Sequence, residues 1–387
     1  MNLDDDFGKE IKDTLQKAAE NITTSKGFKE SVDKELLKCC PQLRRKIAII
    51  FGGNSSEYSV SLESAYAVIS HINKEKYQPI LIGISSKGDW FKFSGDIEKI
   101  IADTWCNTSD CAPVTVSLDK TKHNLLVLEN NKIETIHIDA AFPVLHGKNG
   151  EDGTVQGIFE LVGIPIVGCG TLSSALCMDK DRAHKLAHIA GIAIPTSFVL
   201  EKNMDAGKAL TQAEQIGFPL FVKPVKAGSS YGITKVTNRQ ELPAAIKLAF
   251  EYDEQVIIEE YISGFEVGCA VLENKDGSLI VGEVDEIELS NGFFNFTEKY
   301  TLKTSAIHVP ARIDAATAER VKQTAKTIFK ALDCQGFARV DMFLSDSKKI
   351  VFNEVNTIPG FTAHSRFPNM LKAIGMTFEQ IISTAIE

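Results

Sequence analysis

The sequence predicts an α/β fold divided into two or three domains, and three observations lead to this prediction. The chain has 387 residues, which exceeds the usual size of a single domain. Its hydrophobic and charged fractions, 44% and 24%, are ordinary for a globular protein. Short apolar runs alternate with stretches of helical periodicity, which is typical of a parallel sheet covered by helices on both faces.

The first domain is expected over residues 45–170. KIAIIFGG, which opens at Lys46, is a continuous apolar run that ends in glycines, so it predicts a buried parallel strand. Helices are expected over about 61–73 and 154–162. Further strands are expected at YQPILIGIS, AAFPVLHG and IPIVG. The domain should end near Gly170.

Two further domains are expected over 171–258 and 259–387. The first should contain helices at about 180–190 and 239–250, with strands at PTSFVL, FPLFVKP, KVT and VIIEEYI. The second should contain a helix at about 316–332, with strands at CAVLEN, SLIVGEVDEIEL, ARVDMFL and KIVFNEV. Residues 1–44 are polar, with apolar residues at helical spacing. We interpret them as a loosely attached helical leader, with an interaction helix as the alternative.

Charge, hydropathy and cysteine usage exclude several classes of protein. The net charge is −9 without a basic patch, which argues against nucleic-acid binding. No apolar run approaches the roughly 20 residues that cross a bilayer, and the acidic N-terminus does not fit a secretory signal. The eight cysteines are scattered without a CxxC pair. They favour a reducing cytoplasm over a disulfide framework or a zinc site.

The most informative chemistry lies in ARVDMFLSDSKKIVFNEVN, where two apolar strands flank the turn 346–349. Centring a hairpin on that turn places Asp341 opposite Glu354, with Asn356 on the same face. Opposed carboxylates destabilise a sheet unless a cation lies between them, and oxygen ligands with substrate phosphates favour Mg2+. Arg339 is expected to balance these carboxylates or to stabilise an oxyanion. The alternative is a set of exposed charges on a solvent face.

A loop of small residues follows the strand that carries Lys223. Its backbone N–H groups suit phosphate oxygens, and Lys223 adds a positive charge. The loop residues concerned are Gly228, Ser229, Ser230 and Gly232. An ordinary turn with a solvated lysine is the alternative, which the carboxylate hairpin makes less attractive.

Acidic residues on either side of this loop suggest contacts to a nucleotide and to a substrate. Backbone groups at Glu259 and Glu260 are candidates for binding adenine, and Glu266 for binding ribose hydroxyls, although such glutamates are commonly solvated. FGGNSSEYSVS follows the first strand but lacks GxGxxG, which disfavours NAD. Glu57 in this segment is a candidate partner for a substrate ammonium. The alternative is an acid that complements the helix dipole.

Eight motifs occur in order along the chain: FGGNSSEYSVS, VLHGKNGEDGTVQG, CMDKDRAHK, VKPVKAGSSYG, IIEEYISGFEV, FFNFTEKYT, GFARVDMF and VFNEVNTIPGFTAHSRFP. With them, the chain from about 46 to 387 resembles the D-alanine–D-alanine ligases of the ATP-grasp superfamily. The resemblance implies an N-terminal Rossmann-like domain and two α+β domains that enclose ATP. It also implies a homodimer, because members of this family are commonly dimers.

The resemblance implies a set of nucleotide and metal contacts. ATP would be bound by Lys180, Lys223, Gly228, Ser229, Ser230, Glu259, Glu260, Ile262, Glu266 and Phe293. Two Mg2+ ions, or Mn2+, would be ligated by Asp341, Glu354 and Asn356.

The same resemblance implies the substrate contacts. Glu57, oriented by Ser229, would bind the ammonium of a first D-alanine, with His146 nearby unless that histidine is merely structural. Lys299 and Tyr300 would lie on a loop that closes over the site and excludes water. The oxyanion and the second substrate would be surrounded by Arg339, the Gly360 backbone, Ser365 and Arg366.

The implied reaction has two steps. The first D-alanine carboxylate attacks the γ-phosphate of ATP, which gives an acyl phosphate and ADP. The amine of the second substrate then attacks the acyl carbon, and phosphate leaves. Most of the catalysis would be positioning and charge stabilisation.

Four departures from the housekeeping pattern bear on the second substrate. Glu298 precedes the lysine–tyrosine pair, Lys148 follows His-Gly, Arg366 replaces an apolar residue, and Tyr58 replaces the usual histidine or arginine. The first three look like the vancomycin-resistance ligases, and EKYT is most similar to the VanG-type D-alanine–D-serine group. A histidine replaces the lysine–tyrosine pair in relatives that use D-lactate, so D-lactate is disfavoured.

We therefore expect D-serine as the second substrate and a modified peptidoglycan precursor as the purpose of the reaction. A housekeeping D-alanine–D-alanine ligase is the first alternative. A catalytically inactive nucleotide-binding regulator is the second. The intact Lys223, Arg339, Asp341 and Glu354 argue against the inactive regulator.

Overall fold

The computed structural model describes residues 43–106, 109–202, 206–228, 231–289 and 305–387. Several sequence predictions fall outside these residues. They concern the leader over 1–42 and the site residues Ser229, Ser230, Phe293, Glu298, Lys299 and Tyr300. Within the described residues, no helix is long and apolar enough to cross a membrane.

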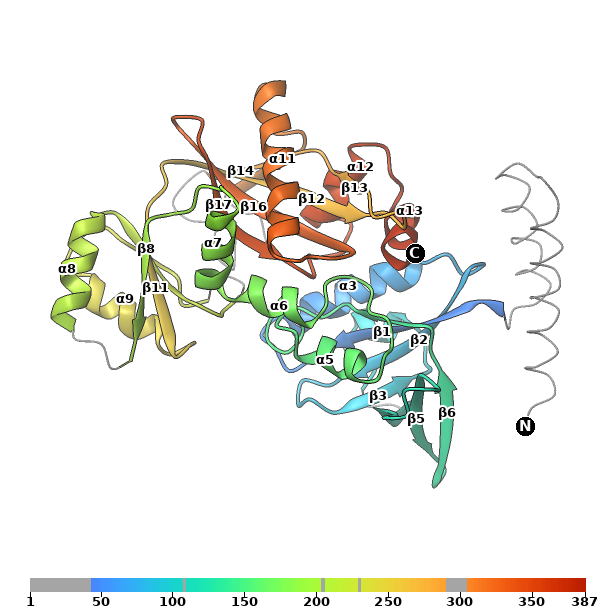
Figure 1. The fold of residues 1–387 in the computed structure, drawn as a ribbon. Coiled ribbons are helices and arrows are strands. Elements are labelled where there is room, and N and C mark those ends of the chain that lie inside the picture. Colours follow the sequence, from blue (N-terminus) through green and yellow to red (C-terminus); the bar gives the residue numbers. More distant parts are fainter. Residues whose placement is uncertain (1–42, 107–108, 203–205, 229–230, 290–304) are drawn as a thin grey trace.

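A seven-stranded sheet, ordered β6-β5-β4-β3-β2-β1-β7, forms the N-terminal part of the fold (Figure 1). β1 (Arg45–Gly52) runs parallel to both β2 (Tyr77–Ile84) and β7 (Ala140–Pro143). These three strands confirm the predictions at KIAIIFGG, YQPILIGIS and AAFPVLHG. Alternate residues of β1 enter two different cores, with Ile47 and Ile49 in one and Ala48 and Ile50 in the other, so this strand is covered on both faces as predicted.

The far half of this sheet is antiparallel, so the expectation of a parallel sheet is wrong there. The strands concerned are β3 (Trp90–Phe93), β4 (Cys111–Val116), β5 (Asn124–Glu129) and β6 (Lys132–His137). Antiparallel strands tolerate one solvated face, and at most two residues of each of these strands are fully buried. Nearly every side chain of β6 is exposed.

The predicted strand at IPIVG is also wrong, since it makes only one isolated bridge, between Ile166 and Ala141. Pro165 has no N–H to donate, and Gly168 turns the chain away with φ +104°. The helices of this part are α3 (Tyr58–His71), α4 (Glu98–Ile101), α5 (Thr154–Leu161) and α6 (Thr171–Met178). Of these, α3 and α5 were predicted.

A four-stranded antiparallel sheet, ordered β10-β9-β11-β8, forms a lobe at one end of the molecule (Figure 1). Its strands are β8 (Ser197–Glu201), β9 (Leu220–Pro224), β10 (Thr234–Val236) and β11 (Gln255–Glu260). The helices α8 (Ala206–Ile216) and α9 (Leu242–Ala249) pack their apolar residues against it. The helix α7 (Lys180–Ile189) precedes this lobe, and all of these elements except α8 were predicted.

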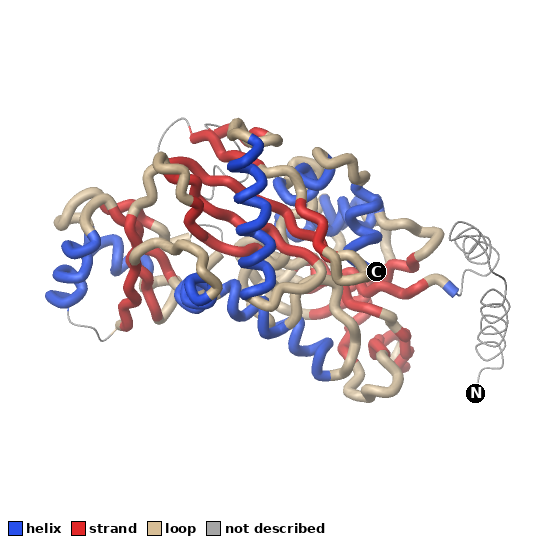
Figure 2. The backbone as a smooth tube through the Cα atoms, turned by 45° about the horizontal axis from the view of Figure 1, so that its top comes forward, coloured by secondary structure: helices blue, strands red, loops and turns tan. Residues whose placement is uncertain are grey.

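The C-terminal part is built on a six-stranded sheet, ordered β15-β14-β12-β16-β17 with β13 beside β12. The strands are β12 (Gly264–Glu273), β13 (Leu279–Val281), β14 (Asp285–Leu289), β15 (Ser305–His308), β16 (Phe337–Ser345) and β17 (Ile350–Asn356). The helix α11 (Ala315–Ala331) packs on this sheet, and α12 (Arg366–Lys372) and α13 (Phe378–Ile386) complete the chain. Figure 2 shows α11 lying across the strands.

The N-terminal and C-terminal parts share one hydrophobic core. Phe51 of β1 and Leu62 of α3 belong to the same buried cluster as Phe337, Phe361 and Ile381 from the end of the chain. Because this core is continuous, the loops that follow β1, β7 and β17 are held in fixed positions relative to one another.

Candidate active site

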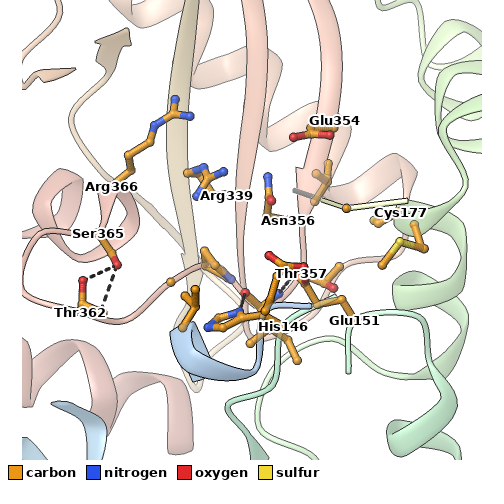
Figure 3. Close-up of a pocket in the computed structure, with 18 of the residues that line it drawn as sticks. His146, Glu151, Cys177, Arg339, Glu354, Asn356, Thr357, Thr362, Ser365 and Arg366 are labelled. Atoms are coloured by element: carbon orange, nitrogen blue, oxygen red, sulfur yellow. Dashed lines mark hydrogen bonds between the residues drawn. The ribbon is translucent and has the colours of Figure 1, made fainter. Parts of the chain in front are cut away.

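A cavity of about 250 Å³ opens where these loops meet α6 and α7. Its lining comes from six of the eight sequence motifs. The residues used below are Glu57, His146, Glu151, Cys177, Lys180, Gly228, Arg339, Glu354, Asn356, Gly360, Ser365 and Arg366. Figure 3 shows many of these side chains pointing toward a common space.

The β16–β17 hairpin brings Asp341 opposite Glu354 and Arg339 opposite Asn356, which confirms the predicted pairing. The turn itself was wrongly centred, because Leu344 pairs with Ile350. Continued without interruption, that register would place Asp341 opposite Asn353. A β-bulge after Asp341 adds one residue on β17 and restores the Asp341–Glu354 pair.

Positive charge already surrounds the buried carboxylate of Asp341. This side chain is 1% exposed. Arg339 donates from Nε at 2.9 and 3.1 Å and from Nη2 at 2.7 Å, and Nη2 of Arg366 lies 3.3 Å away. Arg339 therefore balances the charge of Asp341, which is one of the two roles predicted for it.

The oxygen donors of this hairpin suit a hard divalent cation. Asp341 and Glu354 supply carboxylates, and Asn356 lies beside them with its Nδ2 2.9 Å from Asp341 Oδ2. Rotating the amide by half a turn presents its oxygen instead, since the two orientations have nearly the same shape. An all-oxygen set of this kind fits Mg2+ or Mn2+ rather than zinc.

The strands β9 and β11 carry a buried ion pair that the sequence did not predict. Lys223 Nζ lies 2.5 Å from Glu259 Oε2, and the two side chains are 7% and 2% exposed. Burial raises the pKa of Glu259, but Lys223 and then His184 outweigh it, so the pKa lies below 4.5. The Glu259 carboxylate is thus paired with the lysine, and its predicted backbone contact with adenine remains a prediction.

Replacing Lys223 with methionine should destabilise the protein by about 3–5 kcal/mol at pH 7, because Glu259 is left buried without its cation. Glu259 has a depressed pKa, so its ion-pair stabilisation is present above pH 4.5 and is lost as the pH falls through the lower folded-state value. Thermal melting of the wild type and the variant should therefore converge below pH 4.5. A difference that stays constant from pH 7 to pH 3.5 would contradict this assignment.

Most of the other residues predicted to bind the nucleotide make hydrogen bonds within the protein. Lys180 donates to the Ala227 carbonyl at 2.7 Å, beside Gly228. The Glu260 carboxylate accepts the Thr196 N–H at 2.8 Å, and Ile262 lies in the loop between β11 and β12. Glu266 accepts from Arg366 at 2.8 Å, so its predicted contact with ribose requires sharing the carboxylate with that arginine.

A second buried charge cluster surrounds Arg366, at the start of α12. Arg366 donates to both oxygens of Asp285, from Nε at 2.6 Å and from Nη2 at 2.8 Å. Asp285 is fully buried and Arg366 is 8% exposed. Gly268 makes room for the pair, since a Cβ there would lie 2.3 Å from Arg366 Nη2 and 2.6 Å from Asp285 Oδ1. The sequence identified Arg366 but not Asp285, its fixed partner.

Ser365 and Gly360 lie in one tight loop between β17 and α12. The Ser365 Oγ accepts the Thr362 N–H at 3.0 Å and lies 2.8 Å from Thr362 Oγ1 (Figure 3). A Cβ on Gly360 would lie 2.7 Å from that same oxygen. Glycine at 360 therefore lets the loop fold closely over Ser365.

Glu57 ends up beside the glycines of two other loops. A Cβ on Gly147 would lie 2.4 Å from Glu57 Oε2, and one on Gly228 would lie 3.3 Å away. Glu57 occupies the N-cap position of α3, but its side chain makes no capping hydrogen bond. Glu57 therefore lines the cavity and also stands at the start of α3, which is compatible with both predicted roles, the substrate contact and the helix-dipole alternative. Its neighbour Tyr58 donates to Asp103 instead, at 2.9 Å.

Glu151 is a cavity residue that the sequence prediction missed, although it stands within HGKNGEDG. Its carboxylate accepts the N–H groups of Gly147, at 2.8 Å, and of Ile358, at 3.3 Å. Burial and the neighbouring Glu57 raise the pKa of Glu151 to about 8. A protonated Glu151 explains how two acids share this part of the cavity. His146 is also buried, and burial lowers its pKa.

Comparisons with known proteins agree with the motifs. The family model described as D-ala D-ala ligase N-terminus matches residues 46–169, and that described as D-ala D-ala ligase C-terminus matches residues 186–387. The vancomycin/teicoplanin A-type resistance protein VanA of Enterococcus faecium is 47% identical over 347 residues, which are 89% of this chain and 98% of VanA.

Two further relatives bear on the second substrate. A D-alanine–D-alanine ligase of Caldicellulosiruptor bescii is 43% identical over 88% of this chain and 94% of its own. The crystal structure of the VanG D-Ala:D-Ser ligase from Enterococcus faecalis is 58% identical, with a TM-score of 0.82, over 89% of this chain and 98% of that one.

Proposed function

This chain belongs to the D-alanine–D-alanine ligase family, whose members have the ATP-grasp fold and form a peptide bond at the expense of ATP. From that premise we propose that it joins D-alanine to D-serine through a D-alanyl phosphate, for a peptidoglycan precursor of the vancomycin-resistance type. The observation that carries the D-serine assignment is the buried cluster of Arg366, Asp285 and Glu266 next to Ser365.

In the first step, the ammonium and the carboxylate of D-alanine need partners of opposite charge. Glu57 lies beside Gly147 and Gly228 and supplies the negative charge for the ammonium. Lys180 and Lys223 place positive charge on the opposite, nucleotide side. A carboxylate oxygen of D-alanine then attacks the γ-phosphorus, the bond to the ADP oxygen breaks, and the new C–O–P linkage stores the free energy of ATP.

Asp341, Glu354 and Asn356 would hold the divalent ions, which, when bound, neutralise the negative charge that develops on the phosphates. Arg339, fixed by two donors to Asp341, is positioned to stabilise negative oxygen on the acyl carbon together with the backbone N–H of Gly360. The amine of the second substrate attacks that carbon, loses its proton, and the C–O bond to phosphate breaks.

The acceptor side of the cavity is polar. Arg366 carries five donors, and its planar group is fixed by Asp285 and Glu266. Ser365 adds a hydroxyl at the same end of α12. A site that hydrogen-bonds a substrate hydroxyl rejects the analogue that lacks it, because its own polar groups are then left unpaired. The similarity to the VanG D-Ala:D-Ser ligase supports the same acceptor.

The test is a competition between acceptors at equal concentration. The full chain is incubated with ATP, Mg2+ and D-alanine, together with D-serine or D-lactate, and the products are identified by mass spectrometry. D-alanyl-D-serine should form about 10-fold faster than D-alanyl-D-alanine. Faster synthesis of D-alanyl-D-alanine would instead support a D-alanine–D-alanine ligase, the activity named for the Caldicellulosiruptor relative. Failure to form ADP would support a nucleotide-binding regulator.

A further inference from the structure

One peptide unit at the edge of the cavity is bound on both of its polar groups. The N–H of Ile358 donates to Glu151 at 3.3 Å, and its carbonyl accepts from Nδ1 of His146 at 2.9 Å. Ile358 immediately precedes the loop that carries Gly360 and Ser365. Figure 3 shows His146, Glu151 and Thr357 close together at the lower side of the cavity.

The other ends of these two side chains are anchored in the N-terminal part. Glu151 also accepts the Gly147 N–H at 2.8 Å. His146 Nε2 lies 3.0 Å from Ser64 Oγ on α3, and that oxygen accepts the Phe361 N–H at 3.3 Å. A carbonyl can only accept, so Nδ1 carries the proton. Burial lowers the pKa of His146 and so favours the neutral ring, in which Nε2 accepts from the Ser64 hydroxyl.

This network joins the two halves of the reaction. On one side, Gly147 lies against Glu57, the residue assigned to the first substrate. On the other side, Gly360 and Ser365 belong to the oxyanion and acceptor loop. The acyl phosphate gives dipeptide only when the amine lies within about 3–3.5 Å of the acyl carbon. A small displacement of either loop therefore lowers the rate of dipeptide formation.

We propose that Glu151, with His146 and Ser64, is a positioning group that fixes the acceptor loop relative to the first-substrate site and so directs the acyl phosphate to the amine rather than to water. The inference rests on the proposed ligase function. It adds Glu151 and Ser64 to the residues that govern the second step, through the loop and without contact to the reacting atoms.

The readout is the ratio of dipeptide formed to ADP formed, measured with saturating first substrate and the better acceptor. Both oxygens of Glu151 accept a backbone N–H, and the hydroxyl oxygen of a protonated Glu151 keeps the capacity to accept. The NH2 group of Glu151→Gln can only donate, so one of the two contacts is lost. The wild-type ratio should be near one. In Glu151→Gln the ratio should fall at least twofold, and the KM for the second substrate should rise more than the KM for the first. The excess ADP reports hydrolysed acyl phosphate.

Controls separate positioning from folding. Glu160→Gln is the matched control, because the Glu160 carboxylate also accepts a backbone N–H, that of Thr171 at 2.7 Å. Glu160 lies outside the cavity. The ratio of dipeptide to ADP in this variant should therefore stay near one. A partly unfolded variant lowers ADP and dipeptide equally and leaves the ratio unchanged. Ser64→Ala removes the hydroxyl between His146 and Phe361 and should lower the ratio even if Glu151→Gln fails to fold.

Ratios near one in every folded variant would overturn the proposal and leave the ligase function standing. A wild type that forms no ADP with D-alanine would instead overturn the function itself.

Discussion

Replacing Asp341 with asparagine should reduce ADP formation by ~10³-fold or more, while the protein remains folded. The substitution keeps the volume of the side chain and removes its charge. Arg339, 2.7 Å from the carboxylate, would then lose its anionic partner, while Arg366 keeps Asp285 and Glu266. The proposed metal would lose its most buried ligand. Steady-state release of ADP with D-alanine and Mg2+ measures the effect.

Asp346→Asn is the matched control for this experiment. Asp346 lies on the same hairpin but is exposed at its turn, where it accepts from Ser263. Its replacement should change ADP formation less than twofold. Retention of more than a tenth of the wild-type rate in Asp341→Asn would show that this hairpin does not hold the catalytic charge.

Replacing Arg366 with leucine should have the second large effect, on stability and on the choice of acceptor. Asp285 is fully buried and would lose both hydrogen bonds from the guanidinium. Breaking a buried pair by removing one partner costs about 3–5 kcal/mol. Denaturant unfolding should show this loss, and the ratio of D-alanyl-D-serine to D-alanyl-D-alanine should fall.

The double variant Asp285→Ala with Arg366→Leu tests the cause of that loss. Removing both charges leaves no uncompensated carboxylate at position 285, so the double variant should be more stable than Arg366→Leu alone. An Arg366→Leu variant within about 0.5 kcal/mol of the wild type would contradict the ion-pair argument. An unchanged product ratio would remove Arg366 from the acceptor site.

Strands with continuous apolar runs were predictable, and so was the carboxylate pair. β1 and β17 are buried over most of their length, and their sequences show it directly. The strands β3 to β6 escaped prediction because they are short and at most two residues of each are fully buried. The bulge after Asp341 could not be seen either, since it arises from pairing with the neighbouring strand.

The candidate site was predictable in its residue types and less so in its partnerships. Arg366 and Asp285 stand 81 residues apart, and Ile358 and Glu151 stand 207 apart, so no local pattern relates them. The segment GEVDEIEL contains four acids, so nothing in it distinguishes Asp285 from its acidic neighbours. The roles assigned to Ser229, Lys299 and Tyr300 remain predictions.

The most direct test of the acyl phosphate mechanism is the transfer of a labelled oxygen atom from D-alanine to phosphate. The chain is supplied with ATP, D-serine and D-alanine labelled with 18O in both carboxylate oxygens, and the released phosphate is examined by mass spectrometry. If D-alanyl phosphate forms and the amine displaces phosphate from its acyl carbon, each phosphate carries one labelled oxygen from D-alanine. Dipeptide accompanied by unlabelled phosphate would contradict the acyl phosphate and the function proposed for this site.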